Sequence, residues 1–136
     1  MPMSDYLQDK LRTLVFRTGA GYVKTAALYV SLHTANPTDA GTGTEVSGGS
    51  YARVNVPPLD ANWSAGTPTD GITSNVNAIT FPAPSANWGV ITHCALWDAV
   101  SGGNMIAYAT LTTPKTVNSG DAAPSFLAGS LVWTWV

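Results

Sequence analysis

Charged side chains are scarce in this chain of 136 residues. Asp, Glu, Lys and Arg make up 10% of it, against about 25% in an average protein. A soluble monomer rarely leaves so much surface uncharged, so the deficit predicts that much of the surface faces other protein. The formal net charge of −2 argues against a nucleic-acid partner.

Cysteine and long apolar runs are also lacking. The single cysteine, Cys94, excludes an intrachain disulfide and lies in an apolar stretch, which indicates an inert core thiol. No apolar run approaches the ~20 residues that span a bilayer, and the first ten residues lack the features of a signal peptide. We therefore expect no membrane partner.

The basic residues gather at the N-terminus. Segment 1–24 holds four basic and two acidic residues, a net +2, whereas the remainder holds two basic and six acidic residues, a net −4. The basic residues of the segment are Lys10, Arg12, Arg17 and Lys24. They form either a solvated helix face or an arm that docks on an acidic neighbour.

Residues 5–17 are predicted to form an amphipathic helix. Ser4 is a suitable N-cap, and Asp5 favours the first turn of a helix. The apolar residues recur at helical spacing as Leu7, Leu11, Leu14 and Val15. Because so short a helix is marginal alone, this stripe must pack on the sheet or on a neighbouring subunit.

Residues 28–54 predict a strand, a long loop and a second strand from about Tyr51. Val30 and Leu32 alternate with polar-edged residues, which is the period of a strand. The following run of Asn, Pro, Thr, Asp, Gly and Ser has almost no apolar anchor and exceeds the usual ~12–15 residue limit, which predicts a contact-forming loop. Glu45 and Arg53 either pair and pin the base of this loop or remain solvated charges.

The rest of the chain alternates short apolar runs with Gly, Pro and Asn turns. A second polar loop is expected at 62–74, and strands at 76–81, 88–97, 105–111, 115–117 and 126–136. Both faces of 88–97 are apolar, so that strand is expected at the centre. We predict one all-β domain over 1–136, with the helix and arm in 1–24 and a jelly-roll-like β-sandwich of about seven or eight strands in 25–136.

No constellation of residues indicates a catalytic site, a cofactor site or a metal site. The histidines and Cys94 match no zinc spacing, and no nucleophile elbow, P-loop or dinucleotide motif occurs. Asn36 and Asp39 are better explained as turn formers than as calcium ligands. We therefore expect a protein that is not an enzyme and holds no cofactor.

Tryptophan is abundant, with five in the chain. The favoured interpretation is that these side chains fill the core or a subunit interface, and the alternative is that exposed ones stack on sugar rings of a glycan. Trp133 and Trp135 share one face of the last predicted strand with Leu131.

Four stretches together resemble small bacteriophage virion proteins that are often labelled tail fibre or minor structural proteins. The string LYVSLHTANPTDAGTGTEVSGGSYAR, residues 28–53, resembles the opening signature of that family. Residues 4–17, 77–111 and 112–136 resemble its N-terminal helix, its middle hairpin and its end. The resemblance implies a virion part, and the lack of a signal peptide and of a membrane span predicts that it is assembled in the host cytoplasm.

Within that class, small size and the lack of a fibrous repeat favour a head decoration protein that binds the major capsid protein as a homotrimer. One alternative is a tail-fibre or baseplate component bound to tail proteins, and another is a glycan-binding receptor module. The candidate interface residues are Leu7, Leu11, Leu14, Asn36, Asp39, Glu45, Tyr51, Arg53, Trp133 and Trp135.

Overall fold

The computed structural model describes residues 2–67 and 69–134, and its paired strands are all antiparallel. The all-β class with one N-terminal helix is confirmed. Along the chain the elements are α1 (Asp5–Phe16), β1 (Tyr29–His33), β2 (Val54–Asn55), β3 (Ile72–Ser74), β4 (Ile79–Thr80), β5 (Gly89–Trp97), β6 (Met105–Val117), β7 (Ser125–Phe126) and β8 (Val132–Thr134).

The main sheet has four strands in the order β2-β1-β5-β6. The register of its two central strands places Val30 opposite Leu96 and Leu32 opposite Cys94, and all four side chains are buried. They share one face because residues two apart on a strand point the same way. Trp97 on the other face is buried as well, so β5 is the expected central strand.

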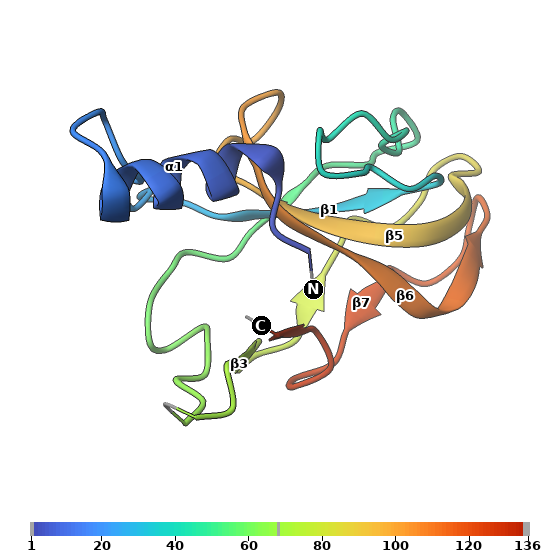
Figure 1. Ribbon diagram of the computed structural model, residues 1–136. Helices are drawn as coiled ribbons and strands as arrows, with labels where there is room; N and C mark the ends of the chain where they lie inside the picture. Colours follow the sequence, from blue (N-terminus) through green and yellow to red (C-terminus); the bar gives the residue numbers. More distant parts are fainter. Residues whose placement is uncertain (1, 68, 135–136) are drawn as a thin grey trace.

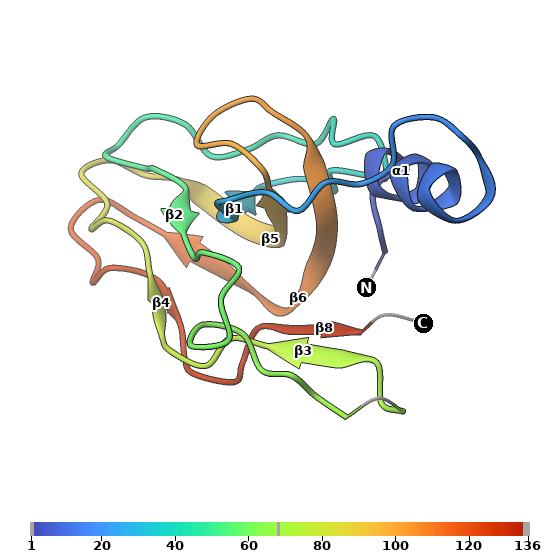
Figure 2. The same ribbon diagram turned by 90° about the vertical axis from the view of Figure 1, so that its left-hand side faces the viewer.

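Two short ladders, β3–β8 and β4–β7, lie below the main sheet in Figure 1 and Figure 2. The core cluster between the layers joins Leu32 and Ile91 of the main sheet to Ile79 and Trp133 of the ladders. Burial of these apolar side chains is the main stabilising term of the fold. The ladders therefore cover the face of the sheet that carries the aliphatic residues.

A register shift in the β5–β6 pair changes the predicted strands. Ile91 pairs with Lys115 and His93 with Thr110, so residues 111–114 lie opposite Thr92 as a wide bulge. β6 therefore continues through Pro114, which a bulge tolerates. The sequence had predicted two separate strands here, at 105–111 and 115–117. The shift also brings Ile91 into the core cluster together with Cys94, although strict alternation along β5 would place these two residues on opposite faces.

Other boundaries also differ from the prediction. The predicted strand 126–136 is interrupted between β7 and β8, and β3 lies where a loop was predicted. The strand expected from Tyr51 is reduced to β2, and that expected at 76–81 is reduced to β4. Pairing partners decide these lengths, because a strand extends only where another strand completes its ladder.

α1 begins and ends within one residue of the prediction. The Ser4 side chain accepts a hydrogen bond from the Leu7 amide at 3.1 Å and donates to the Met105 carbonyl. The Ser4 amide donates to the Ile106 carbonyl at 3.0 Å. The N-cap thus starts the helix and also fastens it to the edge of β6.

The apolar stripe of α1 is buried only at its start. Leu7 is buried and Leu11 is half-buried, whereas Leu14, Val15 and Phe16 are exposed. Figure 1 shows the reason, since the second half of α1 extends past the edge of the sheet. The sheet of the same chain therefore covers about one turn of the stripe and leaves the rest open.

Candidate functional site: the long loop and its buried ion pair

The long loop after β1 folds back on the strand that precedes it. The Thr34 amide donates to the Thr44 carbonyl at 2.9 Å, and the Val46 amide donates to the Leu32 carbonyl at 3.0 Å. Val46 and Pro37 are buried. The expectation that this loop lacks an apolar anchor is therefore wrong, because these two side chains join the interior.

An ion pair closes the base of the loop, as one of the two sequence alternatives predicted. The carboxylate of Glu45 accepts from Nε of Arg53 at 2.8 Å and from its Nη2 at 2.7 Å. Such a bidentate pair fixes both position and orientation. The Arg53 side chain is 5% exposed and the Glu45 side chain 25% exposed, so the pair is partly shielded from water.

Arg53 also reaches beyond the loop. Its Nη1 donates to the carbonyls of Ala99 and Gly102 at 2.8 and 2.9 Å, and its guanidinium lies 4.2 Å from the ring centre of Trp97. A buried guanidinium is tolerated when its donors are satisfied. Arg53 therefore joins three parts of the chain: the loop, the β5–β6 turn and the sheet.

Tyr51 completes the environment of the carboxylate. Its hydroxyl donates to Glu45 Oε1 at 2.9 Å and accepts from the Leu32 amide at 3.0 Å. Burial raises the pKa of Tyr51 well above its ordinary value. Burial opposes ionisation of Glu45, yet the hydrogen bonds from Arg53 and Tyr51 hold its pKa below the ordinary value.

A second polar chain runs beneath the loop on the same sheet. The Trp97 indole donates to Ser31 Oγ at 2.8 Å, Ser31 Oγ lies 2.8 Å from His33 Nε2, and His33 Nδ1 lies 3.4 Å from the Gly43 carbonyl. Since the Gly43 carbonyl only accepts, the proton of His33 lies on Nδ1, and Nε2 then accepts from the Ser31 hydroxyl. Burial lowers the pKa of His33, which favours this neutral form.

The contact between Ser31 and His33 is structural. Both side chains are 0% exposed, so no substrate reaches the hydroxyl. A backbone carbonyl, not a carboxylate, orients the imidazole. A nucleophilic serine needs an accessible position beside a base, and this arrangement instead fixes the residues of the loop against β1 and β5.

The two turn residues singled out in the loop serve local contacts. The Asn36 side chain accepts from the Thr38 amide at 2.9 Å, which is the expected turn-forming role. Asp39 accepts from the Tyr108 hydroxyl at 2.6 Å, and its carbonyl accepts from the Asp5 amide at 2.9 Å. The hydrogen bond to Asp39 raises the pKa of Tyr108 to about 12. The loop thereby contacts the start of α1.

Three tryptophans, Trp88, Trp97 and Trp133, are buried, which confirms the core interpretation for them, and Trp63 is half-buried. Trp135 lies outside the residues that the structure describes. Cys94 is buried too, so its expected place in the core is confirmed, and burial raises the pKa of its thiol to about 12.

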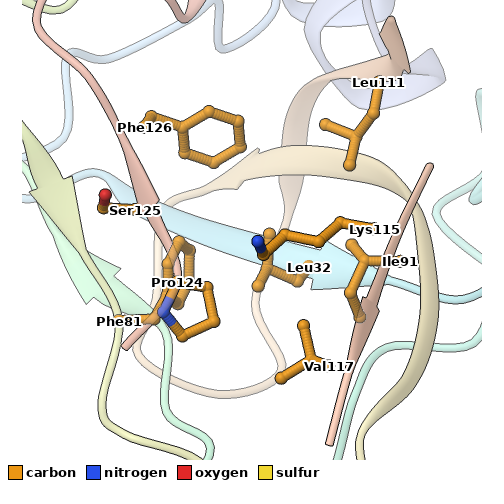
Figure 3. A pocket seen from close by; sticks show the side chains of 9 residues that line it. All are labelled: Leu32, Phe81, Ile91, Leu111, Lys115, Val117, Pro124, Ser125 and Phe126. Carbon is orange, nitrogen blue, oxygen red and sulfur yellow. The ribbon is translucent and has the colours of Figure 1, made fainter. Parts of the chain in front are cut away.

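A small cavity between the two layers is too small for a ligand. It has a volume of about 60 Å³, whereas ligand pockets are typically ~300–1,000 Å³. Figure 3 shows Phe81 and Phe126 on one side of it and Leu32 and Ile91 on the other, with the stem of Lys115 alongside. The cavity is a gap in packing between the layers.

Among residues 2–67 and 69–134, no three His, Cys, Asp or Glu side chains are placed to hold a metal ion. In that same part of the chain, no helix has the length and apolarity needed to cross a bilayer.

Part of this network had a signal in the sequence. Strand alternation places Ser31 and His33 on one face, and the long loop contains Glu45 close to Arg53. The sequence did not indicate that Trp97 contacts Ser31 or Arg53, because these contacts depend on the pairing of β1 with β5. Whether the ten candidate interface residues meet a partner stays a prediction.

The loop and the sheet satisfy each other's polar groups, and the fold that they form is all-β. The family model described as Podophage GP4 fiber I protein gp80 matches residues 2–134. The chain belongs to this family and is a bacteriophage virion structural protein, as the resemblance of its sequence implied. No curated protein matches it.

Proposed function

We propose that this chain is a non-enzymatic structural component of the fibres of a podophage tail. The observation that carries the proposal is the family match over residues 2–134, because the family is described by a fiber protein. This is the first alternative from the sequence; the favoured expectation there was head decoration. Its partners are then tail proteins and copies of itself, held by protein contacts.

The geometry suits a part that must keep its shape. Arg53 donates hydrogen bonds to Glu45 and to two backbone carbonyls, and so links the long loop to the β5–β6 turn. Val46 and Pro37 anchor the same loop in the interior. A loop fixed in this way presents its outer face at little conformational cost on binding.

Immunogold electron microscopy of intact phage with antibodies against the purified chain tests the location. We expect gold at the tail, beside the tail end of the head or along the fibres. Phage that lack the gene serve as the control for specificity. Gold spread evenly over the head surface would reject the tail proposal in favour of head decoration.

A further inference from the structure

The end of α1 and the segment after it form an exposed apolar tip. Phe16 is 80% exposed and Val23 is 81% exposed. The apolar tip consists of the exposed side chains of Leu14, Val15, Phe16 and Val23. Gathered apolar side chains of this size mark a surface that meets another molecule, and the second half of α1, which carries three of the four, extends beyond the sheet (Figure 1).

A hollow of about 260 Å³ lies beside segment 57–65. Its walls are mostly apolar and include Leu28, Leu59, Trp63, Leu96 and Trp133. Lys24 and Asp60 are the charged side chains that line it.

We propose that the apolar tip of one copy inserts into the hollow of a second copy. Phe16 then fills the apolar space between the walls. The last carbonyls of a helix lack intrahelical donors, so the end of α1 offers acceptors to the ammonium group of Lys24. Arg17, next to Phe16 in the chain, meets the carboxylate of Asp60.

Charge selects a second copy as the occupant. Segment 1–24 carries a net +2 and the rest of the chain a net −4, so the arm of one copy is attracted to the body of the next. In Figure 1, α1 and segment 57–65 both lie on the left-hand side of the molecule. Two copies can therefore exchange tips reciprocally or continue into a ring.

This inference rests on the proposed function insofar as a fibre is built from copies of one chain, but its test uses the purified chain alone. Sedimentation velocity from nanomolar to micromolar concentration measures the mass of the wild type, which we expect to exceed that of a monomer. The expected homotrimer is one such assembly. A wild type that stays monomeric at micromolar concentration overturns the proposal.

Two variants test the two surfaces separately. Phe16→Asp removes the apolar ring and is expected to weaken self-association roughly 10- to 100-fold. Ala65→Trp fills the hollow from an exposed position that lines it and is expected to weaken self-association similarly. Val90→Asp, on an exposed residue of β5 outside both surfaces, is the matched control and should assemble as the wild type does.

A charge exchange identifies the contact. Arg17→Glu and Asp60→Lys each weaken self-association about two- to fivefold, and the double variant recovers most of the loss. All of these positions are exposed, so the melting temperature of each dilute variant should match that of the wild type. Assembly that is unchanged in both Phe16→Asp and Ala65→Trp rejects the contact, whereas gold on the head rejects only the tail location.

Discussion

The carboxylate of Glu45 accepts two hydrogen bonds from the guanidinium of Arg53, at 2.8 Å from Nε and 2.7 Å from Nη2. The two residues are eight positions apart, and Gly48 and Gly49 lie between them with φ of +73° and +58°. Glycine adopts such angles at little cost, which lets the chain turn back and bring the two charges together.

Removal of Arg53 should be costly for stability. Arg53→Ala leaves the half-buried Glu45 carboxylate without its cationic partner and removes the donor to the carbonyls of Ala99 and Gly102, and we expect a loss of ~3–5 kcal/mol in the free energy of unfolding. Arg53→Lys should lose less but remain destabilising, because an ammonium group cannot make the bidentate contact. Urea denaturation measures both.

The exposed pair of Arg12 and Asp9 is the control for this prediction. Their side chains are 66% and 58% exposed, so Arg12→Ala should change stability by only ~0–1 kcal/mol. A double-mutant cycle of Glu45→Ala with Arg53→Ala should give a coupling of ~0.5–3 kcal/mol. Coupling near zero would show that the buried pair contributes nothing specific.

Stability should fall as the solution is acidified, first because of His33. Burial lowers the pKa of this imidazole below its ordinary value of 6.5, so below that pH the unfolded chain binds the proton more readily than the folded protein. The resulting loss begins as the pH falls through about 6.5 and continues down to the folded pKa. Glu45, whose folded pKa is lowered, contributes stability that is present above its ordinary value of 4.5 and lost as the pH falls through the folded pKa.

Melting temperatures from pH 8 to pH 5 check the contribution of His33. His33→Gln should lower the melting temperature at pH 8 and flatten its decline between pH 7 and pH 5. The pKa of His93 is also lowered by burial, but this residue is half-buried, so His93→Gln should retain most of the decline. Parallel curves for His33→Gln and the wild type would contradict the assignment.

The α1 stripe should show graded effects on stability. Leu7→Ala removes a buried side chain and should cost ~2–5 kcal/mol, whereas Leu14→Ala changes a side chain that is 59% exposed and should stay within ~0.5 kcal/mol. Leu11→Ala should fall between them. Urea denaturation at low protein concentration measures all three, and equal losses at the three positions would mean that α1 is covered along its length.

Gly43→Ala should open the long loop. A Cβ at Gly43 would lie 2.4 Å from both Cα and N of Pro37, and backbone atoms cannot move aside as a flexible side chain does, so we expect a loss of ~1–3 kcal/mol. Hydrogen exchange at the Thr34 and Val46 amides, which close this loop, should accelerate.

Gly120→Ala is the matched control for the loop. Its Cβ meets nothing within 4 Å, and its φ of +84° makes the substitution strained, at a cost of about 1–2 kcal/mol. This variant should be destabilised without a selective effect on the Thr34 and Val46 amides. If Gly43→Ala leaves both amides as protected as in the wild type, the loop does not depend on that close approach.

Local patterns were sufficient for several elements. The Ser4 cap and the leucine spacing predicted α1 to within one residue, and alternation predicted β1 and β5. The polar composition of 34–50 predicted a loop. These features depend on residues within a few positions of each other, which is why one sequence contains enough information to identify them.

Contacts between distant residues decided the rest. The bulge opposite Thr92 moved Ile91 into the core, and the bond from Trp97 to Ser31 joins residues 66 positions apart. The edge of the sheet left Leu14 exposed while it covered Leu7. Register and burial depend on which strands meet, and an individual strand carries too little information to choose its partner, so only the packed chain fixes them.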